Sequence, residues 1–85
     1  MTSIEQHQQL LGTVNSANPD VNSAAATINQ YTELCKSGQI STVEYAQLLR
    51  DIQHTININA AAIEQQNLNT LNTVINGLID IAGAV

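Results

Sequence analysis

Apolar side chains recur at intervals of three and four residues along most of this chain, which is the spacing of one face of an α-helix. The clearest pattern covers about residues 19–36, and Pro19 suits its first position. A thinner pattern covers about residues 3–15, where Ser3 with Gln6 can cap the start. The apolar face of the longer segment carries Val21, Ala24, Ile28, Tyr31 and Cys35. Both patterns predict α-helices.

The segment 37–41 predicts a sharp turn between two helices. Gly38 stands where an ending helix needs a residue that adopts positive φ. Ser41 and Glu44 have the spacing of a capping box, in which each side chain accepts a hydrogen bond from the other's backbone N–H. Ile40 and Tyr45 flank this box as a hydrophobic staple, which fixes the direction of the second helix.

A third helical pattern begins at residue 42 and meets no glycine or proline before Gly77. Uninterrupted, it gives a helix of about 40 residues and roughly 60 Å. Two outcomes are open: one long helix over 42–82 within a multi-chain bundle or coiled coil, or a break near 57–59 or 66–70 that gives a compact bundle of four helices. We expect the long helix.

The predicted protein is therefore all-α, a helical hairpin or bundle in a single domain of residues 1–85. Residues 1–18 form a peripheral N-terminal helix and linker, and residues 19–85 form the hairpin core. A chain of this length buries little surface, and Tyr31 and Tyr45 are its only aromatic side chains. This composition favours stabilisation by a partner or by self-association.

The C-terminal stretch is apolar around most of its predicted helix and is interrupted only by Asn76 and Asp80 after residue 74. Asp80 marks the solvent side or pairs with a cation of a partner. We expect this helix to be the contact surface for a second copy or another protein. The surface would consist of Leu68, Leu71, Val74, Ile75, Leu78, Ile79, Ile81, Ala82 and Val85.

Charge is scarce and negative, with two basic residues against seven acidic ones and a formal net charge of −5. Binding to nucleic acid or to an anionic membrane requires more Lys and Arg, so we expect neither partner. Ten Asn and nine Gln take the place of charged residues. Their number reflects either a compositional habit of the source or a surface that faces other protein.

No group of residues points to catalysis, a metal or another cofactor, so we expect a protein that is not an enzyme. His7 and His54 lie far apart in the sequence and no His-x-x-x-His pair is present. Cys35 is the single cysteine, which excludes an intrachain disulfide, and its place on the apolar stripe predicts a buried small hydrophobe.

Two resemblances follow from these motifs. The segment 31–49 is similar to the helix–turn–helix phrase of SHOCT-type modules, although Val43 replaces the acidic residue usual before Glu44. The region 37–85 resembles small helical structural proteins of tailed bacteriophages, which implies a place in a virion tail or baseplate. The residues that carry the SHOCT-like phrase are Tyr31, Leu34, Gly38, Gln39, Ile40, Ser41, Glu44, Tyr45, Leu48 and Leu49.

The leading functional expectation is a non-enzymatic helical assembly protein that self-associates or docks into a larger complex. The alternative is a small acidic regulator or inhibitor that binds one host protein. The N-terminus lacks the basic and apolar regions of a signal peptide, and the apolar segment 74–85 is too short to span a membrane. We therefore expect synthesis in a cytoplasm, and the phage resemblance adds the virion as a destination.

Overall fold

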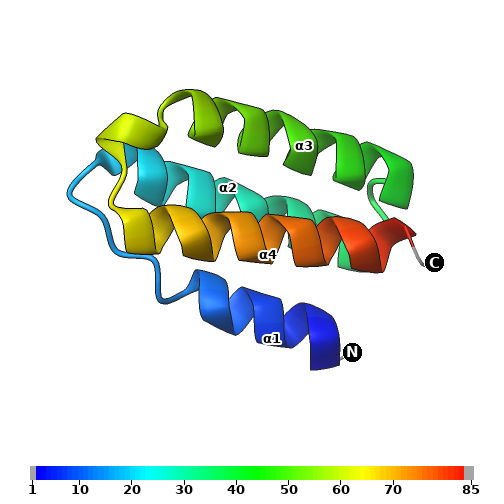
Figure 1. Ribbon diagram of the computed structural model, residues 1–85. Coiled ribbons are helices and arrows are strands. Elements are labelled where there is room, and N and C mark those ends of the chain that lie inside the picture. Colours follow the sequence, from blue (N-terminus) through cyan, green and yellow to red (C-terminus); the bar gives the residue numbers. More distant parts are fainter. Residues whose placement is uncertain (1, 84–85) are drawn as a thin grey trace.

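Four α-helices and one short 3₁₀-helix make up the computed structural model, which describes the backbone of residues 2–83 and the side chains of residues 4–83 (Figure 1). No strand occurs in that range, so the all-α class predicted from the sequence is confirmed. The cap expected at Ser3 and the contact expected at Val85 lie outside the described side chains. The elements are α1 (Thr2–Leu11), α2 (Pro19–Lys36), α3 (Thr42–Ile58), η1 (Ala60–Ala62) and α4 (Gln65–Gly83).

The four helices form an up–down–up–down bundle in which each runs antiparallel to the next along the chain (Figure 1). α4 packs against α3 on one side and against α1 on the other, while α2 packs against α3 and more lightly against α1. The bundle measures 34 × 22 × 18 Å. Helix–helix connections this short favour antiparallel neighbours.

The core between the helices is almost entirely aliphatic. Ile28, Leu49, Leu71, Val74 and Ile75 are fully shielded from solvent. All four helices and the η1–α4 connection contribute to it, and α1, which we expected to be peripheral, supplies Leu11. The buried apolar side chains are Leu11, Val21, Ile28, Tyr45, Ala46, Leu49, Ile56, Ile63, Leu71, Val74, Ile75, Leu78 and Ala82.

The expectation of one long helix over 42–82 is wrong, because the chain breaks after Ile58 and folds back. Asn59 caps α3, and its side-chain amide donates to the Thr55 carbonyl. After η1, Ile63 is extended (φ −116°, ψ 136°) and buries its side chain at this end of the core. Folding back lets the apolar stripes of α3 and α4 cover each other, which a single long helix could achieve only with other chains.

Glu64, just before α4, stabilises this break through hydrogen bonds to the α1–α2 connection, which is far away in the sequence. Its carboxylate accepts from the Ser16 hydroxyl at 2.5 Å and from the Ala17 N–H at 3.1 Å. Asn67 donates both to Glu64 and to the Asn15 carbonyl. The Ser16 hydrogen bond, helped by the backbone N–H groups of Glu64 and Ala17 and the Asn67 amide, lowers the Glu64 pKa to about 2.

Replacing Glu64 by glutamine should flatten the acid end of the stability profile. Because the pKa of Glu64 is about 2 when folded and 4.5 ordinarily, its contribution is present above pH 4.5 and lost as pH falls towards 2. Thermal midpoints measured between about pH 2 and about pH 7 should therefore fall less steeply at acid pH in Glu64→Gln and in Ser16→Ala than in the parent. Parallel curves for all three proteins would show that this carboxylate does not hold the connection.

The turn between α2 and α3 is a Schellman motif. Gly38 has φ +80°, and its N–H donates to the Cys35 carbonyl at 3.1 Å. The Gln39 N–H donates to the Leu34 carbonyl at 2.9 Å. These two bonds satisfy carbonyls at the end of α2 that have no partner within the helix.

A capping box then starts α3, as the spacing of Ser41 and Glu44 predicts. The Glu44 N–H donates to Ser41 Oγ and the Ser41 N–H donates to Glu44 Oε1, both at 3.1 Å. Ile40 packs against the core, and Tyr45 lies within it. Thr32 Oγ1 donates to the Ile28 carbonyl at 2.8 Å, so the Tyr45 hydroxyl, 2.7 Å away, donates to Thr32.

Gly38→Val should lower the free energy of unfolding by about 1–2 kcal/mol, because a β-branched residue tolerates positive φ poorly. Gly38→Asn is the matched control, since asparagine adopts the left-handed conformation at a smaller cost. Urea denaturation of the three proteins measures the difference. Equal stability of the valine and glycine proteins would contradict a left-handed cap at this position.

α1 is shorter than the expected 3–15, because the helix ends at Leu11 and the chain turns at Gly12. It meets α4 through a close approach of His7 to Gly77. A Cβ at Gly77 would lie only 2.0 Å from His7 Nε2 and 2.6 Å from His7 Cδ2. The missing side chain of Gly77 therefore makes the space into which the imidazole packs.

Candidate functional site

The apolar face of α4, where we expected a contact surface, packs into the core of the bundle and is covered by the chain itself. Leu71, Val74 and Ile75 are 0% exposed, Leu78 is 1% exposed and Ala82 is 7% exposed. Leu68 and Ile79 are half-buried against the same core, and Ile81 is also half-buried. Side chains with no exposed area cannot contact a partner in this fold. Asp80, on the same helix, is exposed to solvent.

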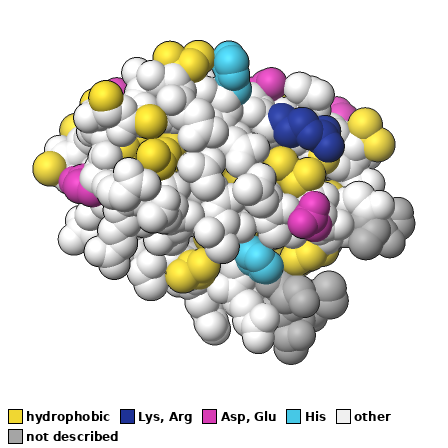
Figure 2. Space-filling view, viewed as in Figure 1, with side chains coloured by type: hydrophobic (Ala, Val, Ile, Leu, Met, Phe, Trp, Pro, Cys, Tyr) yellow, Lys and Arg dark blue, Asp and Glu magenta, His cyan; other side chains and the backbone are white. Residues whose placement is uncertain are grey.

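The outer surface of α4 also lacks a continuous apolar strip. Figure 2 shows this face of the bundle, with α3, α4 and α1 in front as in Figure 1, and its apolar side chains form separate small patches among backbone, polar and charged groups. Single apolar residues at a surface are ordinary and do not indicate an interface. A binding surface has to be sought on another part of the bundle.

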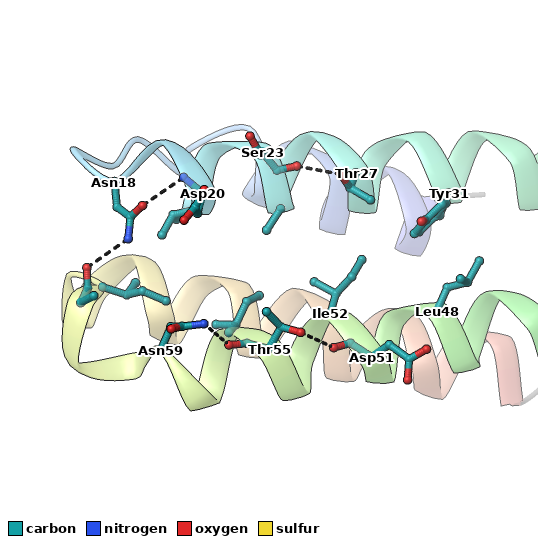
Figure 3. A pocket seen from close by; sticks show the side chains of 15 residues that line it. Asn18, Asp20, Ser23, Thr27, Tyr31, Leu48, Asp51, Ile52, Thr55 and Asn59 are labelled. Carbon is teal, nitrogen blue, oxygen red and sulfur yellow. Dashed lines mark hydrogen bonds between the residues drawn. The ribbon is translucent and has the colours of Figure 1, made fainter.

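A groove of about 560 Å³ lies between α2 and α3. Figure 3 shows side chains from both helices reaching into it, with Tyr31 opposite Leu48 at one end and Asn18 near η1 at the other. Its lining consists of Asn18, Asp20, Val21, Ser23, Ala24, Thr27, Tyr31, Leu48, Asp51, Ile52, Thr55, Ile56, Asn59, Ala62 and Ile63. This volume lies within the range of binding pockets in general.

The groove exists because the α2 side chains that face α3 are small. Ser23, Ala24 and Thr27 occupy successive turns where a larger residue would close the gap. The floor is apolar, since Val21 and Ile56 are buried beneath it. We name this feature the α2/α3 groove.

Three of the polar side chains along the groove already donate hydrogen bonds within the chain (Figure 3). Thr27 Oγ1 donates to the Ser23 carbonyl at 2.9 Å, and Thr55 Oγ1 donates to the Asp51 carbonyl at 3.1 Å. Asn59 Nδ2 donates to the Thr55 carbonyl at 2.9 Å. These three donors would therefore keep their hydrogen bonds if an apolar surface covered the groove.

The charged groups in the lining are all negative. Asp20 and Asp51 stand on opposite walls, and no Lys or Arg lines the groove. Both carboxylates are exposed at the rim. The α2/α3 groove thus combines an apolar floor with an anionic edge.

Cys35 has the surroundings of a packing residue. It is half-buried and free, and it lines a smaller apolar cavity of about 180 Å³ beside Tyr45 and Leu78. Burial raises the pKa of the Cys35 thiol and, as the largest cause, that of the Tyr45 hydroxyl. A raised thiol pKa lowers the thiolate fraction at neutral pH, which makes Cys35 a poor nucleophile.

His7 lies on α1 and His54 on α3, and within residues 2–83 no cluster of three or more His, Cys, Asp or Glu side chains could hold a metal ion. Over the same described residues, none of the helices has the combination of length and apolar character that crossing a bilayer requires.

Many amides on the surface pair with one another between helices. Gln53 of α3 donates to Asn76 at 2.9 Å and to Asn72 at 3.2 Å on α4. Asn57 and Asn72 exchange hydrogen bonds of 3.3 and 3.2 Å. These amides have a role within the bundle, so their number is only a weak sign of a protein-facing surface.

A second polar cluster joins α1 to α2. Gln8 donates to Asn29 at 2.9 Å and to Glu33 at 2.7 Å, and Lys36 lies 3.4 Å from the same Glu33 carboxylate. The Gln8 hydrogen bond, followed by Lys36, lowers the pKa of Glu33. Gln8 is half-buried and the other three residues are exposed, and all four lie away from the α2/α3 groove.

Sequence reasoning did not find the α2/α3 groove, although its residues were in view. Val21, Ala24, Tyr31 and Cys35 were assigned to one buried stripe, but only Val21 is buried and the other three are half-buried. The available signal was the run of small side chains on α2 opposite Leu48, Ile52 and Ile56 on α3. That signal has meaning only once α2 and α3 are known to be neighbours.

Comparison of the chain with models of protein families, with curated proteins and with solved structures finds no match in any of the three.

Proposed function

We propose that this protein is a non-enzymatic docking component that binds a helix of another protein in the α2/α3 groove. The observation that carries the proposal is an apolar groove of about 560 Å³ whose threonine and asparagine donors are already satisfied within the chain. Such a surface gains from burial against apolar side chains without losing hydrogen bonds. A helix laid in a groove is a common way of binding a protein segment.

The dimensions of the groove suit three turns of helix. Its α2 wall extends from Asp20 to Tyr31, which corresponds to about 16 Å along a helix axis. A bound helix would present apolar side chains to the floor at about every third and fourth position over this length. Leu48, Ile52 and Ile56 on the α3 wall follow one another at intervals of four residues.

This proposal keeps the two expected roles, assembly component and small inhibitor, and moves the contact away from α4. Both roles require one surface that accepts another protein, and they differ in the partner. The phage tail or baseplate setting implied by the sequence resemblance stays a prediction.

A neutral amphipathic peptide tests the proposal. The probe is a peptide of about 18 residues in which leucines follow one another at alternating intervals of three and four residues. All other positions are glutamine. We expect calorimetry to detect binding and the amide resonances of the residues that line the groove to shift. No binding, or shifts spread over α1 and the outer side of α4, would overturn the proposal.

A pair of phenylalanine variants on one helix supplies the control. Ala24 lines the groove, so Ala24→Phe should obstruct it and weaken peptide binding by about tenfold or more. Ala26 is exposed on the same helix but is not part of the lining, so Ala26→Phe should bind as the parent does. Equal affinity of the two variants would place the peptide elsewhere.

A further inference from the structure

The charges at the α2/α3 groove define the chemistry of its occupant. We propose, on the basis of the function proposed above, that the bound helix is cationic and comes from a different protein. Its apolar face would lie on the groove floor, and Lys or Arg at its edges would meet Asp20 and Asp51. Complementary charge at the edge of an apolar contact directs association and excludes wrong partners.

The positions of the two carboxylates set the spacing of the basic residues. Asp20 lies in the first turn of α2, and Asp51 lies on the α3 wall opposite the segment from Thr27 to Tyr31 (Figure 3). That segment is seven to eleven residues beyond Asp20, about 10–16 Å along the helix. Two basic residues seven positions apart on the bound helix, about 10.5 Å, match the shorter end of this range.

Tyr31 adds a second contact for a cation near Asp51. Its half-buried ring lines the groove at the end where Asp51 stands on the other wall. A Lys or Arg of the bound helix that lies beside Tyr31 can contact the face of this ring. Arginine suits this place better, because its planar group stacks on rings and binds carboxylates with two donors.

A second copy of this chain does not fit the description. Lys36 and Arg50 are the only basic residues in the sequence, and they lie on different helices. No helix of the chain therefore carries two basic side chains seven positions apart. Packing one groove against another would also bring Asp20 and Asp51 of both copies together, and like charges in contact are unfavourable.

Three peptides of about 18 residues test the inference, all with the same leucine face. One carries glutamine at every other position, one carries two arginines seven positions apart beside the leucines, and one carries two glutamates at those places. We expect the arginine peptide to bind about tenfold more tightly than the glutamine peptide, and the glutamate peptide to bind more weakly. Equal binding of the arginine and glutamine peptides would overturn the inference and leave the proposed function standing, whereas no binding of either would overturn both.

Charge-matched variants separate recognition in the groove from general attraction to an acidic protein. Asp20→Asn with Asp51→Asn should remove the advantage of the arginine peptide, about tenfold, and leave the glutamine peptide unchanged. Glu33→Gln with Asp80→Asn removes the same charge outside the groove and should preserve most of that advantage. Equal losses in the two double variants would overturn the inference.

The single variant Asp51→Asn protects the test against a folding defect, because Asp20 lies in the first turn of α2 where a carboxylate stabilises the helix. Circular dichroism checks each variant before titration. If Asp51→Asn keeps its helix content and still binds the arginine peptide with the parent's affinity, the assignment of a cation to this carboxylate is wrong.

Discussion

Replacing Leu78 by alanine is expected to lower the free energy of unfolding by about 2–5 kcal/mol, the largest effect of any substitution considered for this chain. Leu78 is 1% exposed in the C-terminal half of α4, where it packs among the side chains of the common core. The change removes buried surface and leaves a cavity that close-packed neighbours fill only in part. Urea denaturation measures the loss, and Ile58→Ala is the control.

Ile58 is 69% exposed at the end of α3, so its truncation should change stability by no more than about 0.5 kcal/mol. The midpoint of Leu78→Ala should also be independent of protein concentration, since the lost contacts lie within one chain. A small loss of stability, or a loss that grows when the protein is diluted, would indicate that Leu78 lies in an interface between chains.

Gly77→Ala is expected to be the second large effect, a loss of about 1–3 kcal/mol in spite of the better helix propensity of alanine. The new Cβ would lie 2.0 Å from His7 Nε2, so either the imidazole or the whole of α1 must move. Because α1 packs chiefly on α4, displacement at this point loosens the helix from the bundle. Denaturation of the variant, with amide exchange in α1, measures both effects.

Two controls isolate this contact. Gly83→Ala adds the same methyl group to α4 at a position with no neighbour within 4 Å and should cost nothing. His7→Ala combined with Gly77→Ala should recover part of the stability lost in the single glycine variant, because the clash is gone. Additive losses in the double variant would mean that the two residues do not meet.

The turn between α2 and α3 could be predicted because its rules are local. Gly38 with its neighbours, and Ser41 with Glu44, satisfy backbone groups within a few residues of themselves, so their spacing alone carries the information. The start of α2 at Pro19 follows in the same way, with Asn18 accepting from the Asp20 N–H.

The break between α3 and α4 could not be predicted from local sequence in the same way, because some of the residues that stabilise it lie far away in the sequence. Glu64 is held by Ser16 and Ala17, which are 48 and 47 residues away. Asn59 and the three alanines of η1 form no strong stop signal by themselves. The fold back is decided by tertiary contacts, so sequence reasoning could only offer it as the alternative.

The same limitation explains why α4 was assigned to an interface. An apolar stripe shows that a helix is buried, but it does not show whether its own chain or another supplies the cover. Once α3 folds back, Leu71, Val74 and Ile75 lose all their exposed surface and the candidate contact moves to the α2/α3 groove. Small residues such as Ala24 and Thr27 indicate a groove only once α2 and α3 are known to be neighbours.

Sedimentation equilibrium of the intact chain, over a wide range of concentrations, shows whether the chain covers its own C-terminal apolar face and leaves the α2/α3 groove for a different protein. We expect one species of 9.1 kDa at every concentration, with no larger form at the highest. A mass that rises with concentration, and falls back to that of one chain when Leu78 is replaced by alanine, would contradict this expectation.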